Sequence, residues 1–493
     1  MGRRDALLRL SIMAALLLGG AMAPVFAADV KNLSVTVSSG TQANAYGGYT
    51  IEEGASALQN ALTLSGPAKV LGASAGGWSR WGNAEWNTLT IRLDEDGLLG
   101  PSDIVGGGVA ESEGGGAAVH NTVYIESGTV EGTVEGGVAV GINGVGDGTG
   151  DVLSNQVTMS GGTVYSVFGG ETGERNANDN VVTIKGSAAV TGKSNAVYGG
   201  YTIDGNASGN IVNIEDDADI HGEIMGGYTR AGSLISGNKV NVTGGNVNEN
   251  TVYGAYTAYG DVLDNQAVIK GTGQAGSSDT NSVYAGFTNI GAAAGNILYI
   301  QDSAEIAGSA FAGYQGGFIS SETVERNQVF MSGGSVGGDL TGGGSNNGGE
   351  TLNNYVEITG GTVSGNVYSG FTDSADALEN TLTVAGGRVE GSLFGGYSNT
   401  GTANENKLTF SAGTAGSDAY GGYAQEGADG NEAVLSGTSV LEGNAAGGSS
   451  ARGEASGNSL TIKENSEVKG DAAGGDVYMG TISKNIITIQ YNA

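Results

Sequence analysis

Residues 198–214 contain the two strand patterns that decide the fold. The first reads Tyr198-Gly199-Gly200-Tyr201-Thr202, and the second reads Asn210-Ile211-Val212-Asn213-Ile214. In the second pattern the asparagine and every second aliphatic residue share one face, which is typical of a β-strand that buries one side. The first pattern places aromatic residues around a glycine pair, and glycine allows neighbouring backbones to approach closely. Together they predict two short strands joined by a compact connection.

Both patterns recur in alternation along the chain. The glycine pattern returns at 46–50, 225–229, 394–398 and 420–423, and looser copies lie at 284–288 and 368–372. The asparagine pattern returns so that its first residue is Asn60, Asn87, Asn121, Asn155, Asn180, Asn210, Asn238, Asn265, Asn296, Asn327, Asn354, Asn380, Asn406, Asn431, Asn458 and Asn485. A turn such as Ser160-Gly161-Gly162-Thr163-Val164 follows the asparagine strand. Repeats of this length indicate stacked units that bury their apolar faces only against their neighbours.

We therefore predict an all-β protein, a parallel β-helix or solenoid of about sixteen Gly/Asn-rich coils with two main strands in each coil. A β-propeller is the structural alternative, although its blades are usually longer and contain four strands. Stacked coils would bring the repeated amides together into a hydrogen-bonded ladder. We assign to this ladder Asn121, Asn155, Asn210, Asn238, Asn354, Asn380, Asn406 and Asn458.

The composition supports short strands and tight turns. The 493 residues include 94 Gly and only 3 Pro, yet 39% of the chain is hydrophobic, so neither collagen nor a flexible low-complexity chain fits. The net charge of −31 excludes attraction to nucleic-acid phosphates or to anionic lipid surfaces. The absence of cysteine removes disulfides, thiolate metal sites and cysteine nucleophiles.

Residues 1–27 have the three parts of a secretory signal peptide. Arg3, Arg4 and Arg9 form a basic region, residues 10–18 are apolar, and Val25-Phe26-Ala27 is a small-residue cleavage site. The apolar run is too short for a stable membrane span, and a buried N-terminal helix is the alternative. We expect an exported chain whose residues 28–493 form a single elongated β-solenoid domain with no transmembrane helix.

The repeats resemble the passenger region of bacterial autotransporters of the type V secretion class. The features that carry this resemblance are the signal peptide, the Tyr-Gly-Gly-Tyr strands, the Asn-x-Val-x-Ile strands and the Gly-Gly-x-Val turns, and they cover residues 28–493. The resemblance implies an adhesin-like right-handed β-helix at the surface or outer membrane of a Gram-negative cell. Such proteins end in a membrane β-barrel, and this sequence stops after the sixteenth repeat, so we expect a truncated passenger. A full-length form would have an outer-membrane translocator as a partner.

Residue types suited to catalysis or metal binding are few. His120 and His221 lie in different repeats, without metal-site spacing. The acidic runs 94–97 and 215–219 could offer oxygen ligands to calcium, but solvated turns are the simpler interpretation. We expect no cofactor, no metal and no enzymatic activity.

All three tryptophans fall within residues 78–86. Trp78 replaces the second aromatic residue of a glycine pattern and should be a rung of an aromatic ladder. Trp81 and Trp86 follow in a connector. They could stack on sugar rings, as exposed aromatic residues do at recognition sites, or cover the first coils against solvent.

Three functions fit these features. The first is an adhesin-like display scaffold whose loops bind a glycan or protein on a host or neighbouring cell, because length variation is concentrated in the connectors. The second is a passive structural rod of the cell surface or matrix. The third, which we consider less favoured, is a secreted polysaccharide-degrading β-helix enzyme.

Overall fold

The computed structural model describes residues 29–490, apart from 102–103, 112–114, 142–147, 194–195, 249, 277–282, 318–320 and 347. The chain forms two compact units, an N-terminal unit of residues 1–192 and 196–206 and a C-terminal unit of residues 193–195 and 207–493. The predicted signal peptide, 1–27, lies outside the described residues. The prediction of one elongated domain over 28–493 stays a prediction.

One turn of the N-terminal unit shows how the strands arise. It consists of β10 (Thr88–Leu93), β11 (Leu98–Leu99), β12 (Val105–Glu111) and β13 (Ala118–Val119). Alternation along β10 buries its leucine and isoleucine side chains and turns its threonines outward. β10 pairs in parallel with β6 (Ala61–Gly66) in the preceding turn and with β14 (Thr122–Ser127) in the following one. Each sequence repeat is therefore one turn of a parallel solenoid.

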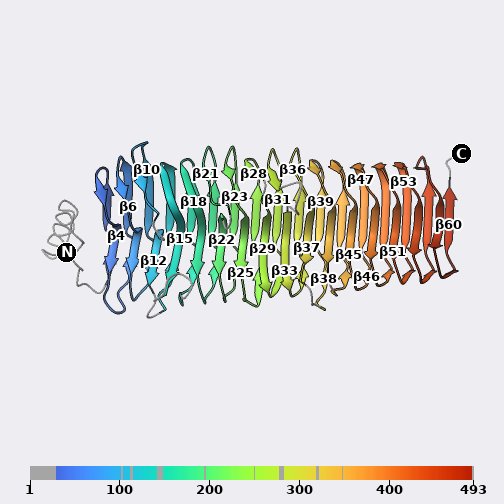
Figure 1. The fold of residues 1–493 in the computed structure, drawn as a ribbon, viewed down its shortest axis with the longest axis horizontal. Coiled ribbons are helices and arrows are strands. Elements are labelled where there is room, and N and C mark those ends of the chain that lie inside the picture. Colours follow the sequence, from blue (N-terminus) through green and yellow to red (C-terminus); the bar gives the residue numbers. More distant parts are fainter. Residues whose placement is uncertain are drawn as a thin grey trace. The chain divides into compact units, whose positions relative to one another are not determined.

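The C-terminal unit repeats the same plan. A representative turn contains β43 (Tyr355–Ile358), β44 (Thr362–Val363), β45 (Val367–Thr372) and β46 (Ala377–Leu378). Strands from successive turns lie side by side, as Figure 1 shows for β25 (Ile224–Thr229), β29 (Val252–Tyr259), β33 (Val283–Ile290) and β37 (Ala310–Gln315), which pair in parallel in that order.

These pairings confirm the predicted fold class. The described residues contain no helix, and the strands stack in parallel with one repeat per turn. Both predicted main strands are present in each turn. In many turns the structure adds two strands of two or three residues, one after the asparagine strand and one before the next ladder asparagine; in other turns the first of these is continuous with a main strand, as in β47 (Thr381–Val389). The latter group forms its own small sheets, such as β1 (Val30–Lys31), β5 (Ala57–Leu58), β9 (Ala84–Glu85), β13, β16 (Val152–Leu153) and β19 (Ala177–Asn178).

Length variation lies in the connectors before and after the glycine strand: before it, residues 191–196 separate β21 (Ala189–Val190) from β22 (Val197–Thr202), whereas only residues 364–366 separate β44 from β45. In the C-terminal unit β45 and β46 are separated only by residues 373–376, whereas in the N-terminal unit residues 141–151 separate β15 (Thr129–Val140) from β16. Strand pairing keeps its register on both sides of that long connector, between β12 and the end of β15 and between β13 and β16. Because backbone hydrogen bonds fix the strands, insertions are accommodated where the chain turns.

The interior of each unit is aliphatic. Small and branched side chains from every turn are fully buried there, as with Leu89, Ile91 and Val123 in the N-terminal unit and Val356, Ile358 and Leu382 in the C-terminal unit. Because matching positions carry similar side chains, stacking places each of them on a like neighbour. Burial of this kind is the main stabilising contribution in a chain without cysteine.

Candidate functional site

The repeated asparagines form a buried ladder of amides inside each unit. Asn121 is representative: its backbone N–H and its side-chain Nδ2 both donate to Oδ1 of Asn155, at 2.9 and 3.0 Å. The same Nδ2 also donates to the backbone oxygen of Ala84, at 2.8 Å. Every polar atom of the amide is therefore bonded, which is the condition for burying such a group without a large energetic cost.

The structure places all eight predicted ladder residues in these ladders. Asn121 and Asn155 belong to the N-terminal unit, and the other six belong to the C-terminal unit, where bonds of the same form connect Asn210 to Asn238, Asn238 to Asn265, and so on to Asn485. The second glycine of each glycine pair lies directly over an amide. A Cβ added to Gly108, for example, would meet the side chain of Asn121. The ladder and the glycine pattern therefore depend on each other, and the role of both is structural.

A left-handed residue precedes every ladder asparagine among the described residues, with φ between 52° and 68°. Sequence reasoning missed this corner because its identity varies. Glycine fills it in some turns, and in others it holds Gln59, Trp86, His120, Ser154, Asp179, Asp264, Arg326, Asn353, Glu379, Glu405 or Lys484. A non-glycine residue in this conformation is strained by about 1–2 kcal/mol. The absence of β-branched residues from these corners is the one sequence signal that could have revealed them.

Two aromatic residues occupy successive corners of the N-terminal unit. The ring of Trp86 stacks on that of His120, with centroids 4.2 Å apart and an interplanar angle of 26°. Their backbones are held in place because Trp86 N–H donates to the oxygen of Val119 and His120 N–H to that of Leu153, each at 3.0 Å. Trp86 remains 56% exposed. This stack is the candidate contact site, and it lies on the outside of the solenoid turns.

The sequence predicts one connector for Trp81 and Trp86, but β9 separates them: Trp81 lies between β8 (Ser74–Ser79) and β9 and is only partly exposed, whereas Trp86 follows β9. The guanidinium of Arg80 lies 6.0 Å from the centroid of the Trp81 ring, within the range of a cation–π contact. Arg80 also pairs with Glu111, at 3.6 Å between Nε and Oε2. Neither prediction for Trp81 and Trp86, sugar stacking or a cover for the first coils, is tested by these positions.

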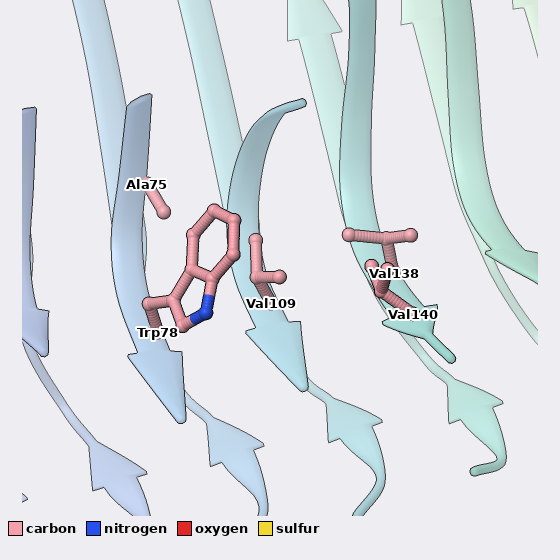
Figure 2. Packing of buried hydrophobic residues seen from close by; sticks show 5 residues of the cluster. All are labelled: Ala75, Trp78, Val109, Val138 and Val140. Carbon is pink, nitrogen blue, oxygen red and sulfur yellow. The ribbon is translucent and has the colours of Figure 1, made fainter. Parts of the chain in front are cut away.

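Trp78 is part of a packed aromatic and aliphatic cluster. Figure 2 shows its ring between the strands with Ala75, Val109, Val138 and Val140. The indole Nε1 donates to Oε1 of Glu111, at 3.0 Å. In the preceding turn Tyr46 meets the same ring edge-on, with centroids 5.4 Å apart. Trp78 is thus a rung of the aromatic stack.

Aromatic residues of the glycine strands also stack in the C-terminal unit. Tyr253, Tyr284 and Phe311 follow one another at centroid distances of 5.2 and 5.0 Å, nearly parallel. Burial raises the pKa of the Tyr253 phenol well above its usual range, with a further rise from the charge of Glu223. Burial likewise raises the pKa of Tyr314 to about 12. These phenols remain protonated except in strongly alkaline solution.

The remaining polar candidates lie on turns. Asp96 N–H bonds to the Asp94 carboxylate at 3.0 Å, which closes an exposed turn. His221 pairs with Asp219 at 2.9 Å, and both are exposed. Within the part of the chain that the structure describes, no three His, Asp or Glu side chains group closely enough to hold a metal ion. Over the same residues, no helix is long and apolar enough to cross a membrane.

A buried pair of carboxyl groups was not foreseen from the sequence. Glu135 and Glu171 occupy aromatic positions of two successive glycine strands in the N-terminal unit and are hydrogen bonded to each other. Comparison with known proteins adds no function to these observations: the chain matches no family model, no curated protein and no solved structure.

Proposed function

We propose that the protein is an exported, adhesin-like β-solenoid that displays a binding surface at the cell surface, and that its partner is an uncharged surface glycan. The proposal assigns it no catalytic role and no cofactor. Export is supported by the signal-peptide pattern of residues 1–27, and display is supported by neighbouring turns whose strands pair in register, as β10 does with β6 and β14 with β17 (Gln156–Met159).

The observation that carries the binding role is the exposed Trp86–His120 stack. A tryptophan at a left-handed corner is strained, and at 56% exposure it gains little from burial. Other turns place glycine at this corner without strain. The fold therefore does not require an indole here, whereas a ligand that stacks on an aromatic face would.

The chemistry of the stack favours a sugar. Exposed indole and imidazole rings offer an apolar face beside polar edges, and this combination suits a pyranose ring with its hydroxyl groups. Asn83 and Glu85 shortly precede Trp86 and are bonded to each other at 2.7 Å, so groups that can bond to hydroxyls lie close by in sequence. A net charge of −31 disfavours an acidic glycan.

Glycan-array binding of the whole chain tests this proposal. Wild-type protein should bind a set of uncharged glycans, and Trp86→Ala should lower that binding by about tenfold or more, as loss of a central aromatic contact does at recognition sites. Tyr259→Ala is the matched control, because Tyr259 is an equally exposed aromatic residue (59%) of the C-terminal unit. The proposal fails if no glycan is bound, or if Trp86→Ala binds as the wild type does.

A passive surface spacer is the second candidate. The uninterrupted ladder of the C-terminal unit favours it, since regular stacking by itself gives length without a ligand. Removing whole repeats between Asn354 and Asn458 distinguishes the two functions. A spacer would lose reach in proportion to the repeats removed, whereas the adhesin-like protein would keep glycan binding through Trp86.

A further inference from the structure

The N-terminal unit replaces part of its aromatic stack with two acids. Glu135 lies on β15 at the first aromatic position of its glycine strand, and Glu171 lies on β18 (Thr163–Thr172) at the second aromatic position of the next turn. The register aligns Glu135 with Phe168 and Val138 with Glu171. The two acids therefore sit diagonally across one pair of neighbouring turns.

Elsewhere this diagonal is an aromatic contact. Tyr46 meets Trp78 of the following turn with centroids 5.4 Å apart. In the C-terminal unit Tyr253 meets Phe287 at 5.8 Å and Tyr368 meets Tyr397 at 5.5 Å. Glu135 and Glu171 occupy the equivalent positions and bond to each other across them. On this diagonal, a hydrogen-bonded pair of acids thus replaces the aromatic contact that other turns make.

The partners of the two acids within their own pair of strands are apolar. Glu135 is 1% exposed, Glu171 is largely buried, and Val138 and Phe168 lie beside them in the two strands. The next strand on one side, β12, brings Glu111, which is held by Arg80 and Trp78. The next strand on the other side, β22 (Val197–Thr202), brings the phenols of Tyr198 and Tyr201.

Two carboxylates this close in an apolar site cannot both be charged at low cost. One proton shared between them makes a charge-assisted hydrogen bond and leaves a single negative charge. Burial raises the pKa of Glu171 to about 7, although the hydrogen bond with Glu135 opposes that rise. The pair therefore gains or loses its proton in the range between mildly acidic and mildly alkaline media.

We propose that Glu135 and Glu171 form a proton-operated latch, which holds the turns of β15 and β18 together while it keeps a shared proton and loosens them when that proton is lost. The device is independent of glycan binding. It makes the packing of the N-terminal unit sensitive to pH near neutrality.

The direction of the effect follows from proton linkage. The unfolded chain releases this proton at about pH 4.3, the ordinary value for glutamate, so the folded unit binds more protons than the unfolded chain between about pH 4.3 and about pH 7. Stability from the latch is complete below this window. It declines as the pH rises through the window and is absent above it.

Thermal unfolding with side-chain variants tests the latch. The midpoint of wild-type protein should fall by several degrees between about pH 5 and about pH 8, since roughly 1 kcal/mol moves the midpoint of a unit of this size by about 2–4 °C. Glu171→Gln, which keeps shape and hydrogen bonding, should remove most of that fall. Glu131→Gln, on the same strand but exposed, should leave it unchanged.

A titration of the wild type keeps the proposal testable if Glu171→Gln does not fold. In protein labelled with ¹³C at the glutamate carboxyl carbon, at least one resonance should titrate near pH 7, and the Glu135→Gln/Glu171→Gln protein should lack it. The latch is refuted if every glutamate of the folded wild type titrates in the ordinary range near pH 4.3. It is equally refuted if Glu171→Gln and the wild type show the same pH dependence of the midpoint.

Discussion

At the scale of single residues, each ladder asparagine makes several buried hydrogen bonds to the turns on either side of it. Asn296 shows the pattern: Nδ2 donates to Val262 oxygen at 3.0 Å and to Oδ1 of Asn327 at 2.9 Å. Its own Oδ1 accepts from the N–H and the Nδ2 of Asn265, each at 3.0 Å. One side chain thus joins three successive turns of the C-terminal unit, and no other residue type combines these donors and acceptors at this size.

Asn296→Ala should therefore destabilise the C-terminal unit. The change removes the amide and leaves the buried donors of Asn265 without their acceptor, which we expect to cost about 2–4 kcal/mol. Chemical denaturation followed by circular dichroism measures the loss. Asn399→Ala is the control, since the Asn399 amide bonds to Asp373 in an exposed position, and its loss should be below about 0.5 kcal/mol. Equal losses in the two variants would contradict the structural role of the ladder.

At the scale of elements, the corner after most glycine strands is closed by a buried polar side chain that the sequence analysis did not identify. The last residue of β48 (Leu393–Ser398) is an example: Ser398 Oγ donates to the oxygen of Ala375 at 2.6 Å and accepts from Gly401 N–H at 2.8 Å. Thr202 of β22 makes the same pair of bonds with Arg175 and Gly205 in the N-terminal unit. The hydroxyl thereby fixes both the end of the strand and the start of the connector.

Ser398→Ala should weaken this corner by about 1–2 kcal/mol, because the peptide groups of Ala375 and Gly401 lose a buried partner. Hydrogen exchange of the Gly401 amide should report the loss locally, together with a lower unfolding midpoint. Thr400→Ala removes an exposed hydroxyl that bonds to Asp373 oxygen in the same connector, and should have little effect. A protected Gly401 amide in Ser398→Ala would overturn this assignment. Ala424, the aligned residue of the next turn, and the equivalent Ala110 and Ala139 of the N-terminal unit show that some corners lack the hydroxyl.

At the scale of the whole molecule, stability is distributed over similar turns within each unit. Each turn bonds only to its neighbours, so a local defect is expected to open a few turns before the rest. Burial of the aromatic stack adds a dependence on alkaline pH, because it raises the pKa of Tyr46 in the N-terminal unit and of Tyr314 in the C-terminal unit to about 12. Unfolded tyrosine ionises at about pH 10. The folded units therefore bind protons more tightly than the unfolded chain, and their stability falls as the pH rises from about 10 to about 12.

Tyr314→Phe should lessen that alkaline loss. At about pH 11 the variant should recover roughly 1 kcal/mol relative to the wild type, after subtraction of the difference between them at about pH 8. Urea unfolding at the two pH values measures this, and the subtraction removes the effect of the lost hydroxyl contact. Tyr478→Phe is the control, because Tyr478 is 86% exposed. No difference between the variants at alkaline pH would show that burial of Tyr314 does not control the titration.

The sequence by itself determined the strands, the period and the identity of the amide ladder. Alternation in stretches such as Asn210–Ile214 selects a strand, and its recurrence at a fixed spacing selects stacking, because like positions must then meet. It also indicated that Trp78 is a rung of the aromatic stack. All of these features depend on short sequence patterns that recur, and such patterns can be recognised from the sequence alone.

Only the tertiary structure decided which residues of different turns meet and what their backbone must do. The left-handed corner that Trp86 and His120 occupy in their two turns holds different residue types in other turns, so no sequence motif identifies it. The contact of Glu135 with Glu171 joins residues that are far apart in sequence and share no pattern, and it arises because the register sets them on one diagonal. The register of the stacked strands brings the two carboxyl groups together, and burial then raises the pKa of Glu171. This pair can therefore be recognised only in the folded chain.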